Sequence, residues 1–200
     1  GSTNTITGLL DAWQDNTPVI FISGQIKRKE TSRNSKTNLR QFGVQEADII
    51  SIVEPITKYA VMVNEPEKIL YHLEKAVHLA LSGRPGPVWI DIPLDVQGFS
   101  PDEKDLIHFI PEEKSINGIC GMDKFFEMYQ QAKRPIILAG NGVRLSGAVE
   151  DLREFSKSNN IPCAVSYLAV DYFEQDNPNY VGRLGIKGDR AGNFAIQNSD

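Results

Sequence analysis

The sequence predicts an α/β protein made of parallel-sheet βαβ units, and three observations support this fold class. Residues 69–81 repeat apolar side chains every four positions, as one face of a helix does. Residues 88–92 form a short apolar run with weak alternation, which is typical of a strand covered on both faces in a parallel sheet. Helical and apolar stretches alternate in the same way along much of the chain, as βαβ units require.

Besides the strand over residues 88–92, three elements are predicted in the first half: a helix that begins at Thr5 and ends before residues 16–18, a buried strand over residues 19–22, and a helix that begins after Asn64 and has its apolar repeat over residues 69–81. Asn64 is the predicted N-cap of the last helix, because Glu67 stands three residues on and Pro66 lies within the first turn. Gly83 is its predicted stop. Residues 42–53 mix apolar and acidic side chains and predict no single element.

A change of composition predicts a division into domains. Residues 98–117 are rich in charge, contain prolines and lack periodicity, which is typical of a linker. We therefore expect one domain over residues 1–97 and a second over residues 118–200.

The second domain is predicted to be of Rossmann type. Its expected elements are a helix capped by Asp123, a strand over residues 135–138, a Gly-rich turn over 139–145, a helix capped by Ser146 and a strand over 162–166. A polar helical stretch then leads to Asp200, and we expect no closing strand before it.

Composition argues against several classes of function. The chain has 200 residues, 40% of them hydrophobic and 24% charged, which is ordinary for a globular protein. Its formal net charge of −5 argues against nucleic-acid binding. No stretch approaches the roughly 18 to 20 consecutive apolar residues of a membrane span, and no signal peptide is recognisable. We therefore expect a cytoplasmic protein whose partners include neither nucleic acid nor a membrane.

The sequence predicts neither a disulfide nor a zinc site. Cys120 and Cys163 are the only cysteines, and neither belongs to a CxxC motif. His72, His78 and His108 stand apart from them and from one another. We therefore expect no metal ligands in this chain.

One polar loop has a local excess of positive charge, with six cations within fourteen residues: Lys27, Arg28, Lys29, Arg33, Lys36 and Arg40. A solvated loop is the usual meaning of such a run, and a dedicated anion site is the alternative.

A glycine turn at the end of a predicted strand is suited to phosphate. Gly140 and Gly142 let backbone N–H groups approach a ligand, and the helix that follows has a partial positive charge at its N-terminus. The spacing is not the GxGxxG of dinucleotide-binding proteins, because the next glycine is Gly147. A nucleotide site and a plain tight turn are both open interpretations.

Resemblance to one family extends along the chain, and five stretches in the family's order carry it: TNTITGLLDAWQDNTPVIFISGQ, QFGVQEADIISIVEPITKYA, SGRPGPVWIDIP, KRPIILAGNGVRLSGA and GRLGIKG. On these stretches the chain resembles the thiamine-diphosphate-dependent enzymes of the acetohydroxyacid (acetolactate) synthase large-subunit type. The resemblance implies a fragment, the C-terminal part of a pyrimidine-binding domain followed by the N-terminal part of a Rossmann-like central domain.

The resemblance also implies an activity for the intact parent. Such an enzyme decarboxylates pyruvate or a related 2-oxo acid and transfers the hydroxyethyl unit to a second 2-oxo acid. It would act on small 2-oxo acids, form a homo-oligomer and bind a regulatory subunit. Two alternatives stay open: another thiamine-diphosphate-dependent 2-oxo acid decarboxylase or oxidase, and a non-catalytic nucleotide-binding module.

Carried over onto this sequence, the resemblance implies three residues near the reaction centre: Phe42, Gln45 and Lys58. Phe42, Gln45 and Glu46 correspond to the family's Phe-Gln-Glu, although two residues separate Phe42 from Gln45 in this chain. Core packing is the alternative role for Phe42, and a plain surface position is the alternative for Lys58.

The resemblance further implies a flavin site, with these positions along FAD: Arg84, Gly140, Asn141, Gly142, Ser166, Tyr167, Leu168, Leu184, Gly185, Ile186, Lys187 and Gly188. The family usually has three small residues at the glycine turn and a His where Lys187 stands. For Arg84, the alternative is a cation that interacts with the dipole of the preceding helix. Relatives without flavin share the fold, so the resemblance leaves FAD open.

The motifs for thiamine diphosphate and magnesium (Mg²⁺) are expected outside this sequence. Generating the reactive form of thiamine needs a carboxylate, and the diphosphate needs a magnesium site of carboxylate and amide oxygens. The family places its glutamate before Thr3 and its Gly-Asp-Gly motif beyond Asp200, and the stretch 188–190 does not fit that motif. The chain by itself is therefore expected to be inactive.

Overall fold

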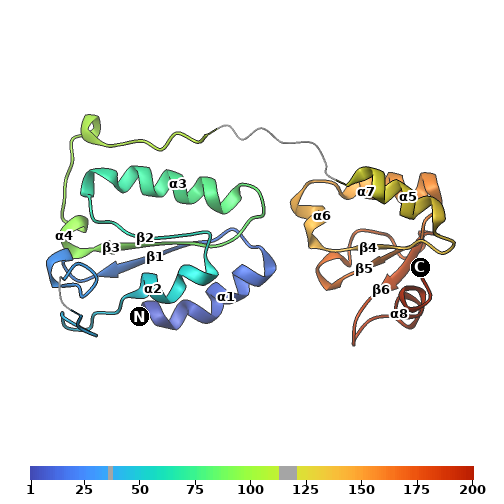
Figure 1. Ribbon diagram of the computed structural model, residues 1–200, viewed down its shortest axis with the longest axis horizontal. Coiled ribbons are helices and arrows are strands. Elements are labelled where there is room, and N and C mark those ends of the chain that lie inside the picture. The colour runs from blue at the N-terminus through green and yellow to red at the C-terminus, as the bar shows by residue number, and fades with distance from the viewer. Residues whose placement is uncertain (36–37, 113–120) are drawn as a thin grey trace. The chain divides into compact units, whose positions relative to one another are not determined.

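The computed structural model describes residues 1–35, 38–112 and 121–200. The chain divides into two compact units, Gly1–Lys114 and Ser115–Asp200 (Figure 1). Each unit has its own three-stranded parallel sheet, so the predicted α/β class is confirmed. The domain limits at residues 97 and 118 stay predictions, and residues 113–118 lie outside the described part of the chain.

The first unit is built on strands β1 (Ile20–Gln25), β2 (Tyr59–Met62) and β3 (Val88–Pro93). They pair in parallel in the order β1-β3-β2, so the strand that comes last in the sequence lies at the centre. The residues of β3 are buried except for Ile92, which is partly exposed. The prediction of a strand covered on both faces is therefore confirmed.

Helices cover both faces of this first sheet. α1 (Ile6–Asp15) and α2 (Ile49–Val53) lie on one side, and α3 (Ile69–Leu81) lies on the other (Figure 1). α4 (Leu94–Gln97) follows β3 directly. Short 3-10 turns occupy Ser2–Thr5, Arg28–Glu30, Glu54–Ile56, Pro66–Lys68 and Glu103–Asp105.

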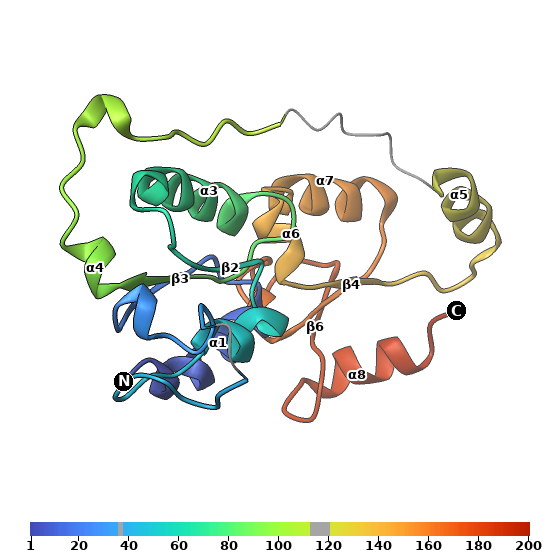
Figure 2. The same cartoon turned by 60° about the vertical axis from the view of Figure 1, so that its left-hand side comes forward.

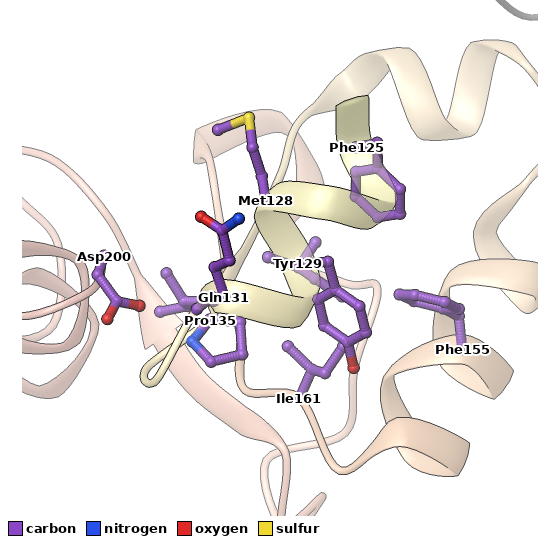
Figure 3. A pocket seen from close by; sticks show the side chains of 11 residues that line it. Phe125, Met128, Tyr129, Gln131, Pro135, Phe155, Ile161 and Asp200 are labelled. Atoms are coloured by element: carbon purple, nitrogen blue, oxygen red, sulfur yellow. The ribbon is translucent and has the colours of Figure 1, made fainter. Parts of the chain in front are cut away.

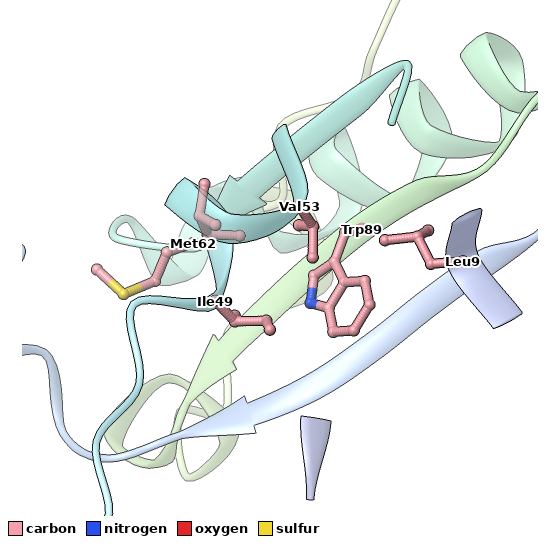
Figure 4. Close-up of a cluster of buried hydrophobic side chains, with 6 residues drawn as sticks. Leu9, Ile49, Val53, Met62 and Trp89 are labelled. Carbon is pink, nitrogen blue, oxygen red and sulfur yellow. The ribbon is translucent and has the colours of Figure 1, made fainter. Parts of the chain in front are cut away.

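Trp89 is the largest side chain in the core under α1 and α2. It is 1% exposed and packs with Leu9 of α1 and with Ile49 and Val53 of α2 (Figure 4). Its ring stacks on Phe21 of β1 with the ring centroids 5.2 Å apart. Side chains at odd positions of β3 thus fix both helices, while Val88 and Ile90 join the core under α3.

Strand β1 differs from the prediction in length and burial. It extends to Gln25, and its side chains alternate between exposed and half-buried, with Ile22 60% exposed. The core under α3 is built from β2, β3 and α3, and β1 pairs with β3 on one side. The prediction of a fully buried strand is therefore wrong for the face of β1 that carries Ile20 and Ile22.

The start of α3 also differs from the prediction. Pro66 begins a 3-10 turn, and the α-helix starts only at Ile69, so Asn64 is not its N-cap. The Asn64 side chain instead accepts a hydrogen bond from Asn34 Nδ2 at 2.8 Å. At the other end the helix stops one residue before Ser82, and Gly83 follows with a φ of +58° as its predicted role requires.

The described part of the predicted linker packs against α3 (Figure 1). The Ile107 N–H donates to the Glu67 carbonyl at 3.1 Å, and the Phe109 N–H donates to Glu74 Oε2 at 2.7 Å. The Phe109 ring meets Tyr71 edge to face, with centroids 5.5 Å apart. This part of the segment is therefore held by the first unit.

The second unit is built on strands β4 (Ile137–Ala139), β5 (Cys163–Val165) and β6 (Tyr180–Arg183), in parallel and in sequence order. Its helices are α5 (Met122–Gln131), α6 (Asn141–Leu145), α7 (Val149–Asn159) and α8 (Arg190–Gln197), with a 3-10 turn at Tyr167–Ala169. α5 and α7 lie on one side of this sheet and α8 on the other (Figures 1 and 2). Tyr172 and Phe173 are the largest residues of its buried core, which also contains Cys163.

Three predictions for the second unit are wrong, and one strand is missing from them. The expected Gly-rich turn over 139–145 holds the short helix α6, and Ser146 ends that helix instead of capping α7. Gly121 is the N-cap of α5, and Asp123 lies within its first turn. Strand β6 was not predicted, because Tyr180–Arg183 has no apolar run and contains Gly182 at a φ of +104°.

Within the described ranges, no helix is both long enough and apolar enough to cross a membrane.

Candidate cofactor sites

A polar cavity of about 560 Å³ lies beside β1 in the first unit. Ser23 and Gln25 of the strand line it together with Trp89, and Gln45 and Ala47 line it from the following loop. Gln45, a predicted catalytic residue, therefore reaches a cavity next to the carboxyl end of a parallel strand. Ligands of open α/β sheets bind at such ends.

The backbone of Gln45 is held in an unusual conformation by the residues that flank it. Its φ is +62°, in the left-handed region that costs non-glycine residues of order 1–3 kcal/mol. Before Gln45 in the chain, the N–H groups of Phe42 and Gly43 donate to Glu46 Oε2, at 2.7 Å and 3.3 Å. Glu46 Oε1 accepts the Ser32 hydroxyl at 2.6 Å. The Glu46 carboxylate therefore closes the loop in front of Gln45.

These hydrogen bonds stabilise the ionised form of the Glu46 carboxylate. Burial alone would raise its pKa, but the hydrogen bonds from Ser32, Phe42 and Gly43 outweigh this effect and leave the pKa below its ordinary value. Glu46 is thus ionised at neutral pH and keeps the loop closed there.

Phe42 lies in the same loop but outside the cavity. Its side chain is 55% exposed, and in the described part of the chain it is not among the residues that line the space next to Gln45. The core-packing alternative is therefore wrong for Phe42, whereas its role near the reaction centre stays a prediction.

A buried carboxylate lies behind this cavity, at Asp91 in the centre of β3. Asp91 is 1% exposed. Its Oδ1 accepts the Ser23 hydroxyl at 2.6 Å, and its Oδ2 accepts Gln25 Nε2 at 3.1 Å. Ser23 in turn accepts the Trp89 indole N–H at 2.8 Å. Burial raises the pKa of Asp91, and the bonds from Ser23 and Gln25 oppose that rise.

Lys58 does not join Gln45 but lies at the other end of the sheet. It directly precedes β2, and it lines a cavity of about 350 Å³ with Arg84, Trp13 and Asn16. Lys58 Nζ donates to the Ser82 carbonyl, and burial lowers the pKa of the ammonium group. Arg84 Nε donates to Asn16 Oδ1. Two residues predicted for different cofactors thus come together in one cationic cavity.

Part of the basic run is used in ion pairs. Arg28 Nε lies 2.8 Å from Asp95 Oδ2, and Arg33 lies 2.9 Å from Asp48 Oδ1. These two cations fix the loop to the ends of α4 and α2, which favours the structural interpretation for them. Lys36, another member of the run, lies outside the described residues.

In the second unit, three of the predicted flavin positions meet at one edge of the sheet. Gly140, Ser166 and Leu184 directly follow β4, β5 and β6. The Ser166 N–H donates to the Ala139 carbonyl and the Leu184 N–H to the Val165 carbonyl, both at 2.9 Å. The carboxyl ends of all three strands therefore present these residues side by side.

The edge of the second sheet has room for a ligand. A Cβ built on Gly140 would lie 3.6 Å from Ser166 Oγ, and one built on Gly142 would meet nothing within 4 Å. Tyr167 is 77% and Leu168 is 45% exposed in the turn after β5. Asn141, the remaining predicted position here, opens α6.

The predicted stretch Leu184–Gly188 is a loop that α8 holds in place. The Gly185 N–H donates to Asn193 Oδ1 at 3.1 Å, and Asn193 Nδ2 donates back to the Gly185 carbonyl at 3.0 Å. Ile186 is fully exposed. The loop therefore presents Ile186 and Lys187 outward on a fixed backbone.

A second contact closes the base of this loop. Asp189 Oδ2 accepts the Arg183 backbone N–H at 2.8 Å, and Asp189 Oδ1 accepts its guanidinium at 3.0 Å. These bonds from Arg183 lower the pKa of Asp189 to about 2. Both side chains are nearly half exposed.

An apolar cavity of about 550 Å³ lies at the opposite end of the second sheet, where no site was expected. Tyr129 of α5 and Phe155 of α7 face each other across it, with Ile161 below (Figure 3). Asp200 lies at its far side, where its carboxylate accepts the Arg134 N–H at 2.8 Å. The apolar stripe of α5 was the sequence signal for this cavity, but the same pattern is equally typical of a helix that packs on a core.

Two family models match the chain, one in each compact unit. Residues 1–52 match the N-terminal TPP binding domain of thiamine pyrophosphate enzymes, and residues 122–200 match the central domain of these enzymes. The chain therefore belongs to the thiamine pyrophosphate enzymes.

Relatives that match all of this chain are acetolactate synthases. It is 33% identical, over 208 residues, to the probable acetolactate synthase large subunit of Methanocaldococcus jannaschii, covering 34% of that protein. It is 34% identical to the large subunit of acetolactate synthase isozyme 2 of Escherichia coli, covering 35% of it. The relative from Corynebacterium glutamicum is 34% identical, with 31% covered. The chain thus spans about a third of the length of these relatives, and the predicted family is confirmed.

Proposed function

We propose that the intact protein is an acetolactate synthase, which decarboxylates pyruvate or a related 2-oxo acid and transfers the hydroxyethyl unit to a second 2-oxo acid. The observation that carries the proposal is similarity over the whole chain to proteins named acetolactate synthase, at 33% and 34% identity. Bound thiamine diphosphate would supply the electron sink for the decarboxylation. Residues 1–200 form part of the site.

The cavity beside β1 fits a contributing role. Ser23, Gln25 and Gln45 give it hydroxyl and amide groups, and its lining in the described residues has no carboxylate. Asp91 lies behind it with both oxygens already hydrogen-bonded. In the described ranges no three His, Cys, Asp or Glu side chains are grouped to hold a metal. This lining can bind and orient a polar ligand, while the acid and the Mg²⁺ ligands come from elsewhere in the protein.

Gln45 is the residue of this chain that we place against the reacting groups, because it alone of the three predicted catalytic residues lines the cavity. Phe42 lies in the same loop with an exposed side chain, and its assignment near the reaction centre is kept as part of the proposal. Lys58 acts from the opposite end of the sheet, where it shares a cavity with Arg84 and binds an anionic part of a ligand.

The test is an assay of the full-length protein with pyruvate, thiamine diphosphate and Mg²⁺. Formation of acetolactate is the expected result, and Gln45→Ala should lower kcat by about ten- to a hundredfold, because misplacing one reacting group has effects of this size. Gln130→Ala, at an exposed position of α5, is the matched control. Acetaldehyde as the sole product would favour a 2-oxo acid decarboxylase, and oxidation of pyruvate would favour an oxidase. No turnover with any 2-oxo acid would favour the nucleotide-binding module.

FAD is the second proposed ligand, at the carboxyl edge of β4, β5 and β6. Nucleotides bind at such edges in doubly wound sheets, and the open space at Gly142 leaves room for one. The fixed loop from Leu184 to Gly188 follows β6 at this edge. The resemblance adds Arg84 to the residues proposed for flavin. Asn141, Ser166, Tyr167 and Leu168 complete the lining.

The flavin proposal is tested by the absorbance of the purified full-length protein. Gly142→Val places a branched side chain where the ligand lies, and Arg84→Ala removes a charged hydrogen bond. Either change should weaken FAD binding about ten- to a hundredfold, from the roughly 1.5–3 kcal/mol of such a bond. Arg84→Lys, which keeps the charge, is the control. A colourless wild type that still forms acetolactate would rule FAD out, and equal flavin in all variants would reject these residues.

The assembly is proposed on separate grounds. The relatives are named large subunits, which supports a smaller regulatory subunit as a partner of the intact protein. Exposed apolar side chains on β1, such as Ile22, support association of protomers into a homo-oligomer. Light scattering of the full-length protein with and without a candidate small subunit tests both. A cytoplasmic location is consistent with this assignment and is part of the proposal.

A further inference from the structure

We propose that the buried carboxylate of Asp91 is a positioning residue for Gln45, acting through Gln25 and the backbone carbonyl of Ala47. The proposal rests on the proposed function for the role of Gln45 in turnover. The contact chain itself follows from the structure alone.

The contact chain starts in the most protected part of the first unit. Asp91 lies on the central strand β3 and is 1% exposed, so its carboxylate needs hydrogen-bond donors from the protein. Gln25, at the end of the neighbouring strand, provides one with its Nε2 atom at 3.1 Å. Ser23 provides the other at 2.6 Å. The carboxylate therefore fixes which way the Gln25 amide faces.

The second contact passes from Gln25 to the loop. Its Nε2 atom also donates to the Ala47 carbonyl at 2.8 Å, while its Oε1 accepts the Ile26 N–H at 3.1 Å. An amide turned the other way would set its oxygen against two acceptors, Asp91 and the Ala47 carbonyl. The Asp91 carboxylate thus keeps Gln25 in the only orientation that binds Ala47.

The third step is the backbone of Gln45 itself. Two anchors hold its left-handed conformation, the Glu46 carboxylate toward Gly43 and the Gln25 contact at Ala47. Loss of the Ala47 anchor leaves residues 44–47 held by Glu46 on one side and by the start of α2 on the other, with the disfavoured φ of Gln45 between them. The Gln45 side chain then no longer keeps its place in the cavity wall, although β3 stays packed.

The first measurement is hydrogen exchange in the full-length protein, followed by mass spectrometry. Asp91→Asn keeps the shape of the side chain but replaces one acceptor with an NH₂ group, so it cannot bind both Ser23 and Gln25 as before. We expect exchange at residues 44–48 at least about tenfold faster, with β3 still protected. Asp95→Asn, which removes a carboxylate at the same edge that binds Arg28, is the control. Unchanged exchange at 44–48 would overturn the proposal.

The second measurement separates positioning from general destabilisation. If Asp91 acts through Gln45, the variant Gln45→Ala/Asp91→Asn should have the kcat of Gln45→Ala alone, whereas Asp91→Asn alone should lower kcat about tenfold with little change in KM. Independent structural damage would instead multiply the two effects, and that result would overturn the proposal. Gln25→Leu, at a partly exposed position, tests the same link if Asp91→Asn does not fold.

Failure of the proposed function shows up earlier in the same experiment. A wild type without 2-oxo acid turnover, or a Gln45→Ala variant with full activity, would reject the assigned role of Gln45. The exchange data would still test the link from Asp91 to residues 44–48 in that case.

Discussion

Two loops at the carboxyl ends of parallel strands are held in place in opposite ways. The loop with Gln45 depends on Asp91, a carboxylate buried in the sheet, whereas the loop from Leu184 to Gly188 depends on Asn193 and Asp189 at the surface. Polar bonds in a dry interior cost more to break than bonds that water can replace. We therefore expect the first loop to be sensitive to core changes and the second to local changes only.

The largest effect should come from the core that supports the first loop. Trp89→Ala removes a fully buried ring and the donor to Ser23, so we expect the first unit to lose about 3–5 kcal/mol of unfolding free energy. Both tryptophans lie in this unit, so urea unfolding followed by the fluorescence of the tryptophan that each variant retains reports it selectively. Trp13→Ala is the control, because that ring is 38% exposed. Equal losses in both variants would contradict the packing of Trp89.

The next largest effect concerns the helix that holds the second loop. A Cβ on Gly192 of α8 would lie 2.6 Å from the Arg183 carbonyl oxygen, so Gly192→Ala should destabilise the second unit by about 1–3 kcal/mol. Gly142→Ala, where a Cβ meets nothing within 4 Å, should have no such cost.

The labelling rate of the Cys163 thiol measures the difference between Gly192→Ala and Gly142→Ala. Burial raises the pKa of this thiol to about 11, so at neutral pH it reacts only when the second unit opens. In a Cys120→Ser background, labelling of Cys163 should be faster in Gly192→Ala than in Gly142→Ala. Identical labelling rates would mean that α8 does not pack on β6 as described.

A smaller, local effect is expected from the two hydrogen bonds between the Asn193 side chain and the Gly185 backbone. Asn193→Ala removes both hydrogen bonds to Gly185, worth about 1 kcal/mol each at most in an exposed site. Hydrogen exchange should accelerate at residues 184–188 while β6 stays protected. Asn198→Ala, whose side chain bonds only within its own helix at Phe194, is the matched control. Acceleration throughout the second unit would show that the loop is not a local feature.

The smallest effect on stability should come from Asp189 at acidic pH. The pKa of Asp189 falls from 3.8 to about 2 on folding, so the folded state binds its proton less tightly than the unfolded state. Its contribution to stability is therefore complete above about pH 4 and is lost as the pH falls toward 2. The difference in thermal stability between wild type and Asp189→Asn should shrink over this range. A constant difference would exclude the ion pair as its cause.

The sequence predicts the parts of the fold whose pattern is local. β3 is a short apolar run interrupted only by Asp91, and α3 repeats apolar side chains every four residues. Both elements occur, although α3 starts later than predicted. α6 and β6 could not be found in this way, because α6 has five residues and β6 contains an exposed Arg and a positive-φ glycine. β6 depends on β5, which supplies the backbone partners that its own residues do not specify.

The candidate site was predicted less completely than the fold. The resemblance implied Gln45 and the glycines of the second unit. It also placed Lys58 near Gln45, whereas the structure puts these two residues at opposite ends of the first sheet. Asp91 was missed, although one acidic residue inside a strand covered on both faces is a signal in itself. Such a residue requires donors from elsewhere in the chain, and only the fold shows that Ser23 and Gln25 provide them.

The strand order has a consequence for how the protein forms during synthesis. β1 and β2 touch only through β3, which pairs Ile20 with Val88 across a long stretch of intervening chain. Among the described strands, neither β1 nor β2 has a ladder partner until β3 leaves the ribosome, so the β1-β3-β2 ladder forms only after residue 93 has been made. Loop closure of this length slows folding. The second unit, whose strands pair in sequence order, can add each strand as it emerges.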